Sequence, residues 1–459
     1  MQQAETKKLS EKIFFAYGFQ EFALGFLTTM GVQYMTYFLT DVALIPAATV
    51  ATIMLIGRIV DTCDIPIISM IVERSNLPWG KYRSWLFIAA PLVMVFNFLM
   101  FSNFDVSLGV KVVYLSLSYI LAYIFVNFCS SARMALLPVF TNDPGERAKL
   151  SVRRGQGSAL SNAIRGAITV PLVTFLGGGN AEKGYAYTVV LYGIIVIIGL
   201  YWIAILAKDY DKPRAAGGPA TRQATIKDML VQLAINKPLL IIVLSNTLML
   251  TATNILTGFN MYYFRYVVGN LNLFSLYMPI TFGGMFLGNS AASILLKKFR
   301  SKKKVYVIGM SIYAAGIGLV YLFAGNSAVM FITFIAIAQF GAGISNGLVP
   351  AFFSDTADYG EWKTGKSVRA VNMGLVIFPI KLGVLIGGSI ASYGLAYIGF
   401  VAGTTDPAVI NGIRFMATIP NIIAAVLAAL VILLWPLTES NLAEIQQTLK
   451  DRAKAQAQA

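Results

Sequence analysis

The sequence predicts an all-α membrane protein with twelve transmembrane helices. Of its 459 residues, 57% are hydrophobic and only 12% are charged, whereas a soluble domain has about 25% charged residues. Apolar runs of about 20 residues, long enough to cross a bilayer as helices, recur along the whole chain. The polar start, with no small-residue cleavage site after it, predicts that no signal peptide is removed.

The spans and their connectors predict two six-helix halves. A polar stretch rich in Pro, Gly and Ala follows the sixth span and suits a linker. We expect an N-terminal half over 1–206, a cytoplasmic linker over 207–237, a C-terminal half over 238–440 and a cytoplasmic tail over 441–459. The expected spans are 13–40, 45–72, 84–102, 110–140, 156–177, 184–206, 238–264, 272–296, 305–324, 328–354, 369–400 and 411–436.

The basic residues predict the orientation of the chain. A net charge of +15 would favour a nucleic-acid partner in a soluble protein, but here Lys and Arg gather in alternate connectors. Basic connectors stay in the cytoplasm, so both termini are expected inside and no nucleic-acid partner is expected. We expect a monomer in the lipid of a bacterial cytoplasmic (inner) membrane. The basic connectors are 73–83, 141–154, 208–237, 297–304 and 361–369.

The basic loop after the second span has a counterpart after the eighth, over 297–304, which indicates a two-fold repeat. Two halves of six helices joined by a cytoplasmic linker fit the major facilitator architecture. In that architecture the substrate binds between the halves near the membrane midplane.

Charged residues within the spans are the candidate functional residues, since intramembrane charges mark functional sites by default. In the second span Arg58, Asp61 and Asp64 share one helix face, because residues three apart are offset by about 60°. The surplus carboxylate can bind a proton or a cation. A charge network that only holds helices together is the alternative. Further intramembrane charges are Glu21, Arg133, Arg165 and Lys381.

The residue types exclude most other functions. The chain has no histidine, and Cys63 and Cys129 have no metal or redox spacing. We therefore expect neither an enzyme nor a cofactor, and no metal beyond a possible Na+ at Asp61 and Asp64. Any proton relay must use carboxylates.

The stretch D358-Y-G-E-W-K-T-G365, followed by F-P-I-K381-L-G, closely resembles the glycoside–pentoside–hexuronide:cation symporters, which include the melibiose and glucuronide permeases. The resemblance implies that a sugar or glycoside is imported by alternating access, driven by H+, Na+ or Li+. Further matches follow in order: Y17-G-F-Q-E21, T40-D-V, R58-x-x-D61, W79-G-K-Y-R83, G145-E-R147 and I413-R…W435-P-L-T-E.

The resemblance also implies roles for single residues. Glu21 matches a sugar-hydroxyl acceptor, Asp61 a cation ligand, and Arg154 the basic residue that opens the fifth span. Lys381 matches a lysine that ties the two halves together close to the cation site. The D-Y-G-E-W-K-T-G stretch is expected to be a cytoplasmic gating loop, whose charged residues are Asp358, Glu361, Lys363 and Arg369.

One departure from the family concerns the coupling ion. Relatives read D-A-x-x-D-P, whereas this chain reads D61-T-C-D64-I-P66, so that Ile65 takes the place of the second aspartate. A shift of one residue turns a helical side chain by about 100° and would re-aim Asp64. This favours H+ over Na+. Helix distortion next to Pro66 could restore the geometry and leaves Na+ open.

A second departure concerns the substrate. Relatives read [N/D]-I-P-[Y/F] in the fourth span, whereas this chain has Ser130 and Arg133 at the two ends of that motif. A guanidinium suits a carboxylate or sulfonate, and Arg165 could add a second positive group. The expected substrate is therefore a hexuronide or a sulfonated sugar. Two other interpretations stay open for Arg133, a salt bridge to Asp61 or Asp64 and a lipid or interface contact. For the function, a Na+-coupled symporter of neutral glycosides or pentosides and a lysolipid-type carrier stay open.

Overall fold

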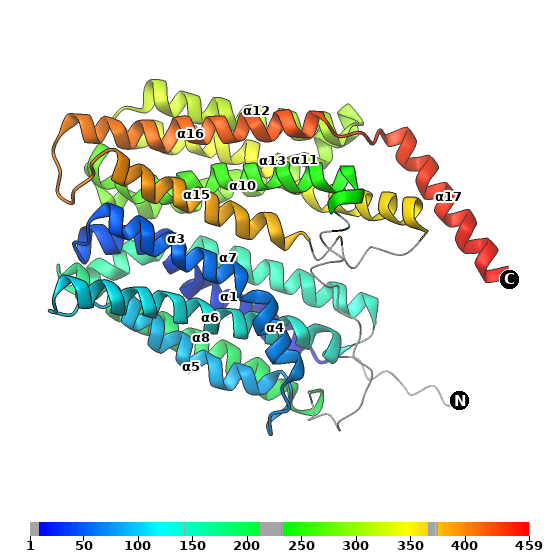
Figure 1. Ribbon diagram of the computed structural model, residues 1–459, viewed down its shortest axis with the longest axis horizontal. Helices are drawn as coiled ribbons and strands as arrows, with labels where there is room; N and C mark the ends of the chain where they lie inside the picture. Colours follow the sequence, from blue (N-terminus) through cyan, green and yellow to red (C-terminus); the bar gives the residue numbers. More distant parts are fainter. Residues whose placement is uncertain are drawn as a thin grey trace. The chain divides into compact units, whose positions relative to one another are not determined.

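The computed structural model describes residues 9–141, 143–211, 231, 233–365, 372 and 375–458, and these contain helices and no strand (Figure 1). Ten helices in the described ranges are long and apolar enough to cross a membrane. They are α5 (Arg83–Met100), α6 (Leu108–Phe140), α7 (Pro144–Gly177), α8 (Ala181–Leu206), α10 (Lys237–Tyr262), α11 (Phe274–Phe299), α12 (Lys302–Leu319), α13 (Ala328–Thr364), α15 (Ile377–Tyr397) and α16 (Pro407–Leu433).

The first two predicted spans are segmented helices and complete the set of twelve. The first consists of α1 (Glu11–Gln33), α2 (Met35–Tyr37) and the π turn η1 (Phe38–Val42). The second consists of α3 (Ala47–Cys63) and α4 (Ile65–Arg74), with Asp64 at the junction. Pro66 in the first turn of α4 explains this break, since proline has no N–H and its ring clashes with the preceding turn.

The chain forms two compact units. The first is Met1–Pro219 with Phe274–Met278 and Val401–Gly403, and the second is Ala220–Leu273, Pro279–Phe400 and Thr404–Ala459. Most of the expected linker over 207–237 lies outside the described residues. The domain boundaries expected from the sequence therefore stay a prediction.

The same packing pattern occurs in both units. In the first unit α1 packs on α7 and α8, while α5 packs on α6 and α8. In the second unit α10 packs on α15 and α16, while α12 packs on α13 and α16. Counted by span, the first helix of each unit contacts the fifth and sixth, and the third contacts the fourth and sixth. An internal repeat predicts this correspondence.

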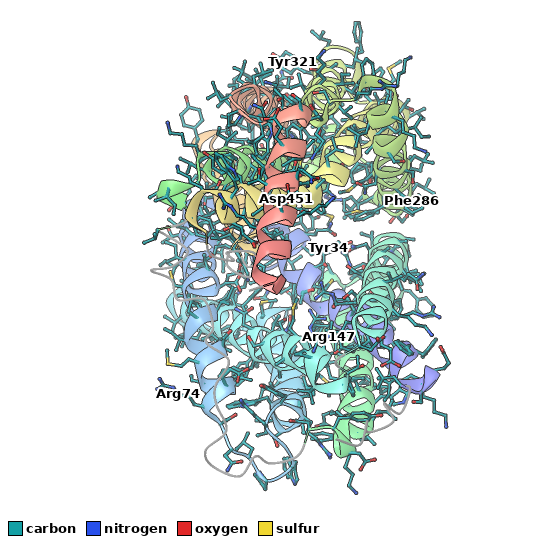
Figure 2. The ribbon with its side chains drawn as sticks, turned by 90° about the vertical axis from the view of Figure 1, so that its right-hand side faces the viewer. Tyr34, Arg74, Arg147, Phe286, Tyr321 and Asp451 are labelled. Atoms are coloured by element: carbon teal, nitrogen blue, oxygen red, sulfur yellow. The ribbon has the colours of Figure 1, made fainter. Side chains whose placement is uncertain are left out.

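Glycines allow the helices to approach closely, as small residues do in membrane proteins. A Cβ atom on Gly157 of α7 would lie 2.0 Å from the carbonyl oxygen of Gly18 of α1. In the second unit, a Cβ atom on Gly288 of α11 would lie 2.0 Å from the carbonyl oxygen of Phe340 of α13. Figure 2 looks nearly along the helix axes and shows side chains filling the space around the helices within each unit.

The first helix of each unit ends in the same backbone shape. The π turn η1 after α2 has a counterpart in η3 (Tyr263–Val267) after α10. Two backbone hydrogen bonds close each turn at equivalent positions. Each turn is followed at the same spacing by a residue with positive φ, Leu44 at 56° and Gly269 at 78°. This conformation favours glycine, so Leu44 holds it with strain.

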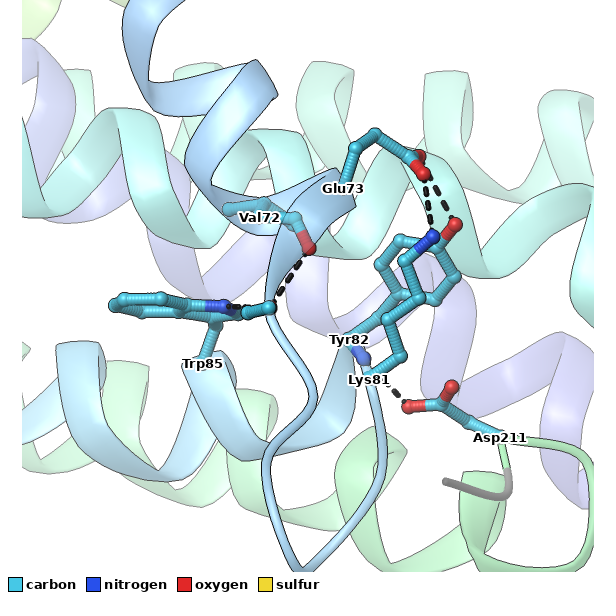
Figure 3. A network of polar contacts seen from close by, with 7 residues as sticks. Val72, Glu73, Lys81, Tyr82, Trp85 and Asp211 are labelled. Atoms are coloured by element: carbon cyan, nitrogen blue, oxygen red, sulfur yellow. Dashed lines mark hydrogen bonds and ion pairs between the residues drawn. The ribbon is translucent and has the colours of Figure 1, made fainter. Parts of the chain in front are cut away.

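A carboxylate holds the loop between α4 and α5 (Figure 3). Asp211, which follows α8, accepts hydrogen bonds of 2.7 Å from the backbone N–H groups of Tyr82 and Arg83. Gly80 has a φ of 125°, and a Cβ atom there would lie 2.4 Å from the carbonyl oxygen of Asp211. This contact explains why W79-G-K-Y-R83 needs its glycine. Burial raises the pKa of the Asp211 carboxyl above its ordinary value, and the backbone N–H groups that it accepts from oppose the rise.

An equivalent carboxylate holds the start of α12. Glu439, which follows α16, accepts a hydrogen bond of 2.9 Å from the backbone N–H of Lys302. The ammonium group of Lys302 also pairs with Asp355 of α13. In each unit, therefore, the segment after the sixth helix binds the N-terminus of the third helix. This shared anchor agrees with the two-fold repeat that the two basic loops predict.

Replacing Gly157 by alanine tests the close approach of α7 to α1. The new methyl group must push apart two backbones, and overpacking of this kind costs about 1–3 kcal/mol. Gly155→Ala is the matched control, because a Cβ atom there meets nothing within 4 Å. Thermal unfolding in detergent should show a lower melting temperature for Gly157→Ala alone. Equal melting temperatures for the two variants would mean that the helices are not in contact at Gly157.

Candidate functional site

The arginine of the second span is enclosed by aromatic rings. Arg58 is 4% exposed, and its Nη2 donates a hydrogen bond of 3.3 Å to the carbonyl oxygen of Gly31. Its guanidinium carbon lies 5.0 Å from the ring centre of Tyr123 and 5.7 Å from that of Tyr119, within cation–π range. Asp61 also acts on it electrostatically. Arg58 is therefore held by groups of the first unit.

The two aspartates of the second span meet at one side chain of α6. The Nδ2 of Asn127 donates a hydrogen bond of 2.9 Å to a carboxylate oxygen of Asp61 and another of 2.9 Å to one of Asp64. An amide N–H2 has two hydrogens and can serve both carboxylates at once. The three residues form one cluster, which we call the cation cluster. Sequence reasoning missed Asn127, whose signal was an amide within an apolar run.

The sequence left two geometries open for Asp64, and the structure has the one with a distorted helix next to Pro66. A straight helix with about 100° per residue would have re-aimed the Asp64 carboxylate relative to the family pattern. In the structure α3 ends at Cys63 and α4 begins at Ile65, so Asp64 lies at the junction. This break turns its carboxylate to the same amide that Asp61 contacts. The sequence argument for H+ over Na+ therefore loses its main support.

Arg133 of α6 forms an ion pair with Glu21 of α1. The sequence analysis left open a salt bridge from Arg133 to Asp61 or Asp64, and the structure gives a different carboxylate as its partner. Tyr17, which sequence reasoning missed, donates a hydrogen bond of 3.3 Å to the carbonyl oxygen of Arg133. It also lies within electrostatic range of Arg154. Tyr17 thus lies within electrostatic range of Glu21, Arg133 and Arg154, and the roles that the resemblance implies for Glu21 and Arg154 stay predictions.

Ser130 lies on α6 three residues before Arg133 and is partly exposed. Residues three apart share a face of a helix, so Ser130 belongs to the face that carries the ion pair with Glu21. Its expected contact with a sugar stays a prediction.

Arg165 of α7 lies in a different environment. It has no exposed surface, and it donates hydrogen bonds of 2.7 Å to the side-chain oxygen of Gln33 and 2.9 Å to that of Asn162. Among the residues that the structure describes, no carboxylate lies within ion-pair distance of Arg165. Sequence reasoning found Arg165 and missed both amides.

The candidate residues of the second unit lie on α13 and α15. The expected gating loop is instead the end of α13, which continues as a helix to Thr364 and is closed by Gly365 at a φ of 69°. Gln446 of α17 (Glu439–Gln458) donates a hydrogen bond of 2.9 Å to Asp358. Lys363 donates one of 2.9 Å to the carbonyl oxygen of Ile235.

The remaining candidates of the second unit are Glu361, Arg369 and Lys381. Glu361 is partly buried on α13, and Arg369 lies outside the described residues. Lys381 is partly buried on α15. The two units are described separately, so the expected tie between Lys381 and the cation site stays a prediction, as does the gating role of the α13 end.

The fold and the sequence both match known transporters. The model of the MFS/sugar transport protein family matches residues 16–439. The chain belongs to this family. It is 30% identical over 451 residues to the uncharacterized symporter YjmB of Bacillus subtilis, covering 97% of each chain. Membership makes it a sugar transporter of the major facilitator fold with twelve membrane helices in two halves, and not an enzyme.

Other relatives and a solved structure agree with this assignment. The chain is 27% identical to the isoprimeverose transporter of Lactiplantibacillus pentosus, covering 94% of this chain and 91% of the relative. It is 27% identical to a glucuronide carrier protein homolog of Escherichia coli, covering 99% and 98%. A bacterial homolog of the human lysosomal transporter Spinster has the same fold, with a TM-score of 0.65 and 12% identity over 92% of this chain and 95% of that chain.

A double-mutant cycle tests the ion pair between Glu21 and Arg133. Each single change, Glu21→Gln or Arg133→Gln, leaves a mostly buried charge without its partner and should lower the melting temperature. The double variant removes both charges and should lose less stability than the sum of the singles, with a coupling energy of about 0.5–3 kcal/mol. Additive losses in thermal unfolding would show that the two side chains do not interact.

Proposed function

We propose that this sugar transporter imports a sugar or glycoside with one negative charge, together with H+ or Na+. The observation that carries the coupling is the cation cluster. Asp61 and Asp64 share the amide of Asn127 within membrane helices, and two neighbouring carboxylates suit a small cation, which supports the proposal. Carboxylates within membrane helices are costly and rare, so their presence indicates a functional role.

The arginines of the first unit support an anionic substrate. The spans of this unit contain Arg133 and Arg165 in addition to Arg58, and a buried guanidinium recognises planar anions through its fork of N–H groups. The name of the glucuronide carrier homolog points to the same substrate class, since a glucuronide carries a carboxylate.

A Na+-coupled importer of neutral glycosides is the second candidate. Glu21 already neutralises Arg133, so this pair presents no net charge to a substrate. The isoprimeverose transporter, named for a disaccharide without a charge, matches this chain as well as the glucuronide carrier homolog does.

Orientation and location form part of the proposal. Basic connectors stay on the cytoplasmic side of a membrane, and they occur here after every second span. We therefore place both termini in the cytoplasm and the protein in the cytoplasmic membrane of a bacterium. Import then means movement towards the side of the anchored α4–α5 loop.

Changing Asp61 to asparagine tests the coupling. The variant keeps the hydrogen-bonding shape of the cation cluster but removes the charge that attracts the cation. We expect it to lose uphill accumulation of substrate while exchange of labelled for unlabelled substrate continues in proteoliposomes. Asp209→Asn, an exposed residue after α8, is the control and should accumulate substrate normally. Normal accumulation by Asp61→Asn would show that Asp61 does not couple transport.

Replacing external Na+ by choline identifies the ion. If H+ is coupled, uptake continues in choline and the external medium becomes alkaline as substrate enters. If Na+ is coupled, uptake stops in choline and the external pH stays constant. Uptake that needs neither Na+ nor proton movement would contradict the proposed symport.

A further inference from the structure

Arg165 of α7 is a buried cation that forms no ion pair with a carboxylate among the residues that the structure describes. We propose that Arg165, rather than Arg133, binds the negative group of the substrate, a carboxylate or sulfonate on a sugar. The inference rests on the function proposed above and names the residue that selects the anion.

The three membrane arginines of the first unit differ in their partners. Arg133 has a carboxylate, that of Glu21. Arg58 has a backbone carbonyl, two aromatic rings and the nearby charge of Asp61. Within the described ranges Arg165 donates hydrogen bonds to the amide oxygens of Gln33 and Asn162, with Tyr34 and Tyr192 in electrostatic range. The buried Nε of Arg165, like that of Arg133, donates no hydrogen bond.

An amide oxygen accepts a hydrogen bond but carries no charge, so it does not neutralise a guanidinium. Burying a charge without a counter-charge is costly even when its N–H groups are bonded. A binding site for an anion retains this cost in the empty protein and loses it when the ligand enters. Arg133 cannot act in this way unless Glu21 first leaves it.

The formal charges of the first unit fit one bound anion. The central parts of its six spans contain three arginines, Arg58, Arg133 and Arg165, and three carboxylates, Glu21, Asp61 and Asp64, which sum to 3 − 3 = 0. A proton or Na+ on the cation cluster brings the sum to +1. One carboxylate or sulfonate at Arg165 then restores neutrality. The loaded unit and the empty unit are both uncharged in their interior.

Helix α1 connects Arg165 to the cation cluster. Gly31 accepts the hydrogen bond of Arg58, and Gln33, two residues further, accepts that of Arg165. Glu21 lies 33 − 21 = 12 residues before Gln33, about 18 Å along the helix axis. Arg165 therefore lies at the level of Arg58, and the ion pair of Arg133 lies at another level of the same helix.

This arrangement couples the two ligands. A cation at Asp61 and Asp64 favours an anion in the same unit, and by thermodynamic reciprocity the anion favours the cation to the same degree. A neutral sugar lacks this electrostatic contribution. Selection of the anion and co-transport of the cation thus have one physical origin.

The decisive variant is Gln33→Glu. It replaces the amide that lies 2.7 Å from Arg165 by a carboxylate of nearly the same shape, and so supplies a permanent counter-charge. We expect the affinity for anionic ligands to fall by roughly 30-fold or more, the scale of losing one desolvated charge contact. The affinity for the matched neutral ligands should change less than threefold, and the melting temperature of the empty protein should rise.

The ligands are three matched pairs, glucose with glucuronate, galactose with galacturonate, and glucose with 6-deoxy-6-sulfoglucose. Binding is measured on the purified full-length protein by ligand-induced thermal shift and by competition. Arg165→Lys keeps a charge without the planar fork and should retain part of the preference for the anion. The double variant Glu21→Gln, Arg133→Gln removes the balanced ion pair and should weaken both members of a pair to the same extent.

The outcomes separate the two proposals. A wild-type protein that binds no anion more tightly than its neutral partner overturns the anionic substrate, and with it the role of Arg165. A wild-type preference for the anion that persists in Gln33→Glu overturns the role of Arg165 alone. A merely structural Arg165, tying α7 to α1, gives a changed melting temperature with an unchanged preference. Loss of the preference in Gln33→Glu, with neutral binding kept, supports the inference.

Discussion

A charged side chain among membrane helices must find a counter-charge, a dipole or a ligand, and this requirement organises the first unit. Each of its arginines meets the requirement differently, Arg133 through Glu21, Arg58 through aromatic rings and a carbonyl, and Arg165 through neutral amides. We infer that this difference in neutralisation separates charges that hold helices together from charges that bind a ligand. A transporter needs both kinds, because a fully balanced interior would bind its ligands too weakly to couple them.

Most of the charged residues within the predicted spans lie in one of two similarly packed units. The helices of the second unit pack in the same pattern as those of the first, yet Lys381 is the single charged residue deep within its predicted spans in the described ranges. Backbone packing of this type depends on glycines and apolar contacts, which both units retain. Polar groups can therefore change in one half without loss of the shared fold.

Much of this could be predicted from the sequence, and the failures have physical causes. The spans were predictable because about 20 consecutive apolar residues have few other structures, and the charged candidates because charges are rare in such runs. Asn127, Gln33 and Asn162 were not, since uncharged amides occur in many spans and only folding brings them to a charge. The direction of the Asp64 side chain was left open between a straight helix and one distorted next to Pro66, because sequence spacing does not show whether a proline breaks the helix. The end of α13 was mispredicted because its polar residues resemble those of a loop. In the structure the helical backbone hydrogen bonds continue to Thr364.

The two carboxylate anchors have a consequence for biosynthesis. The N–H groups at the start of α5 receive their partner only when Asp211 has been made, 129 residues after Tyr82, and the start of α12 depends on Glu439, 137 residues after Lys302. Each half is therefore fastened by a residue that is made after all six of its membrane helices. The first half can be completed before any helix of the second is inserted, in keeping with the folding of domains as units during synthesis. A polypeptide divided between Asp211 and Lys237 would carry one intact anchor in each fragment.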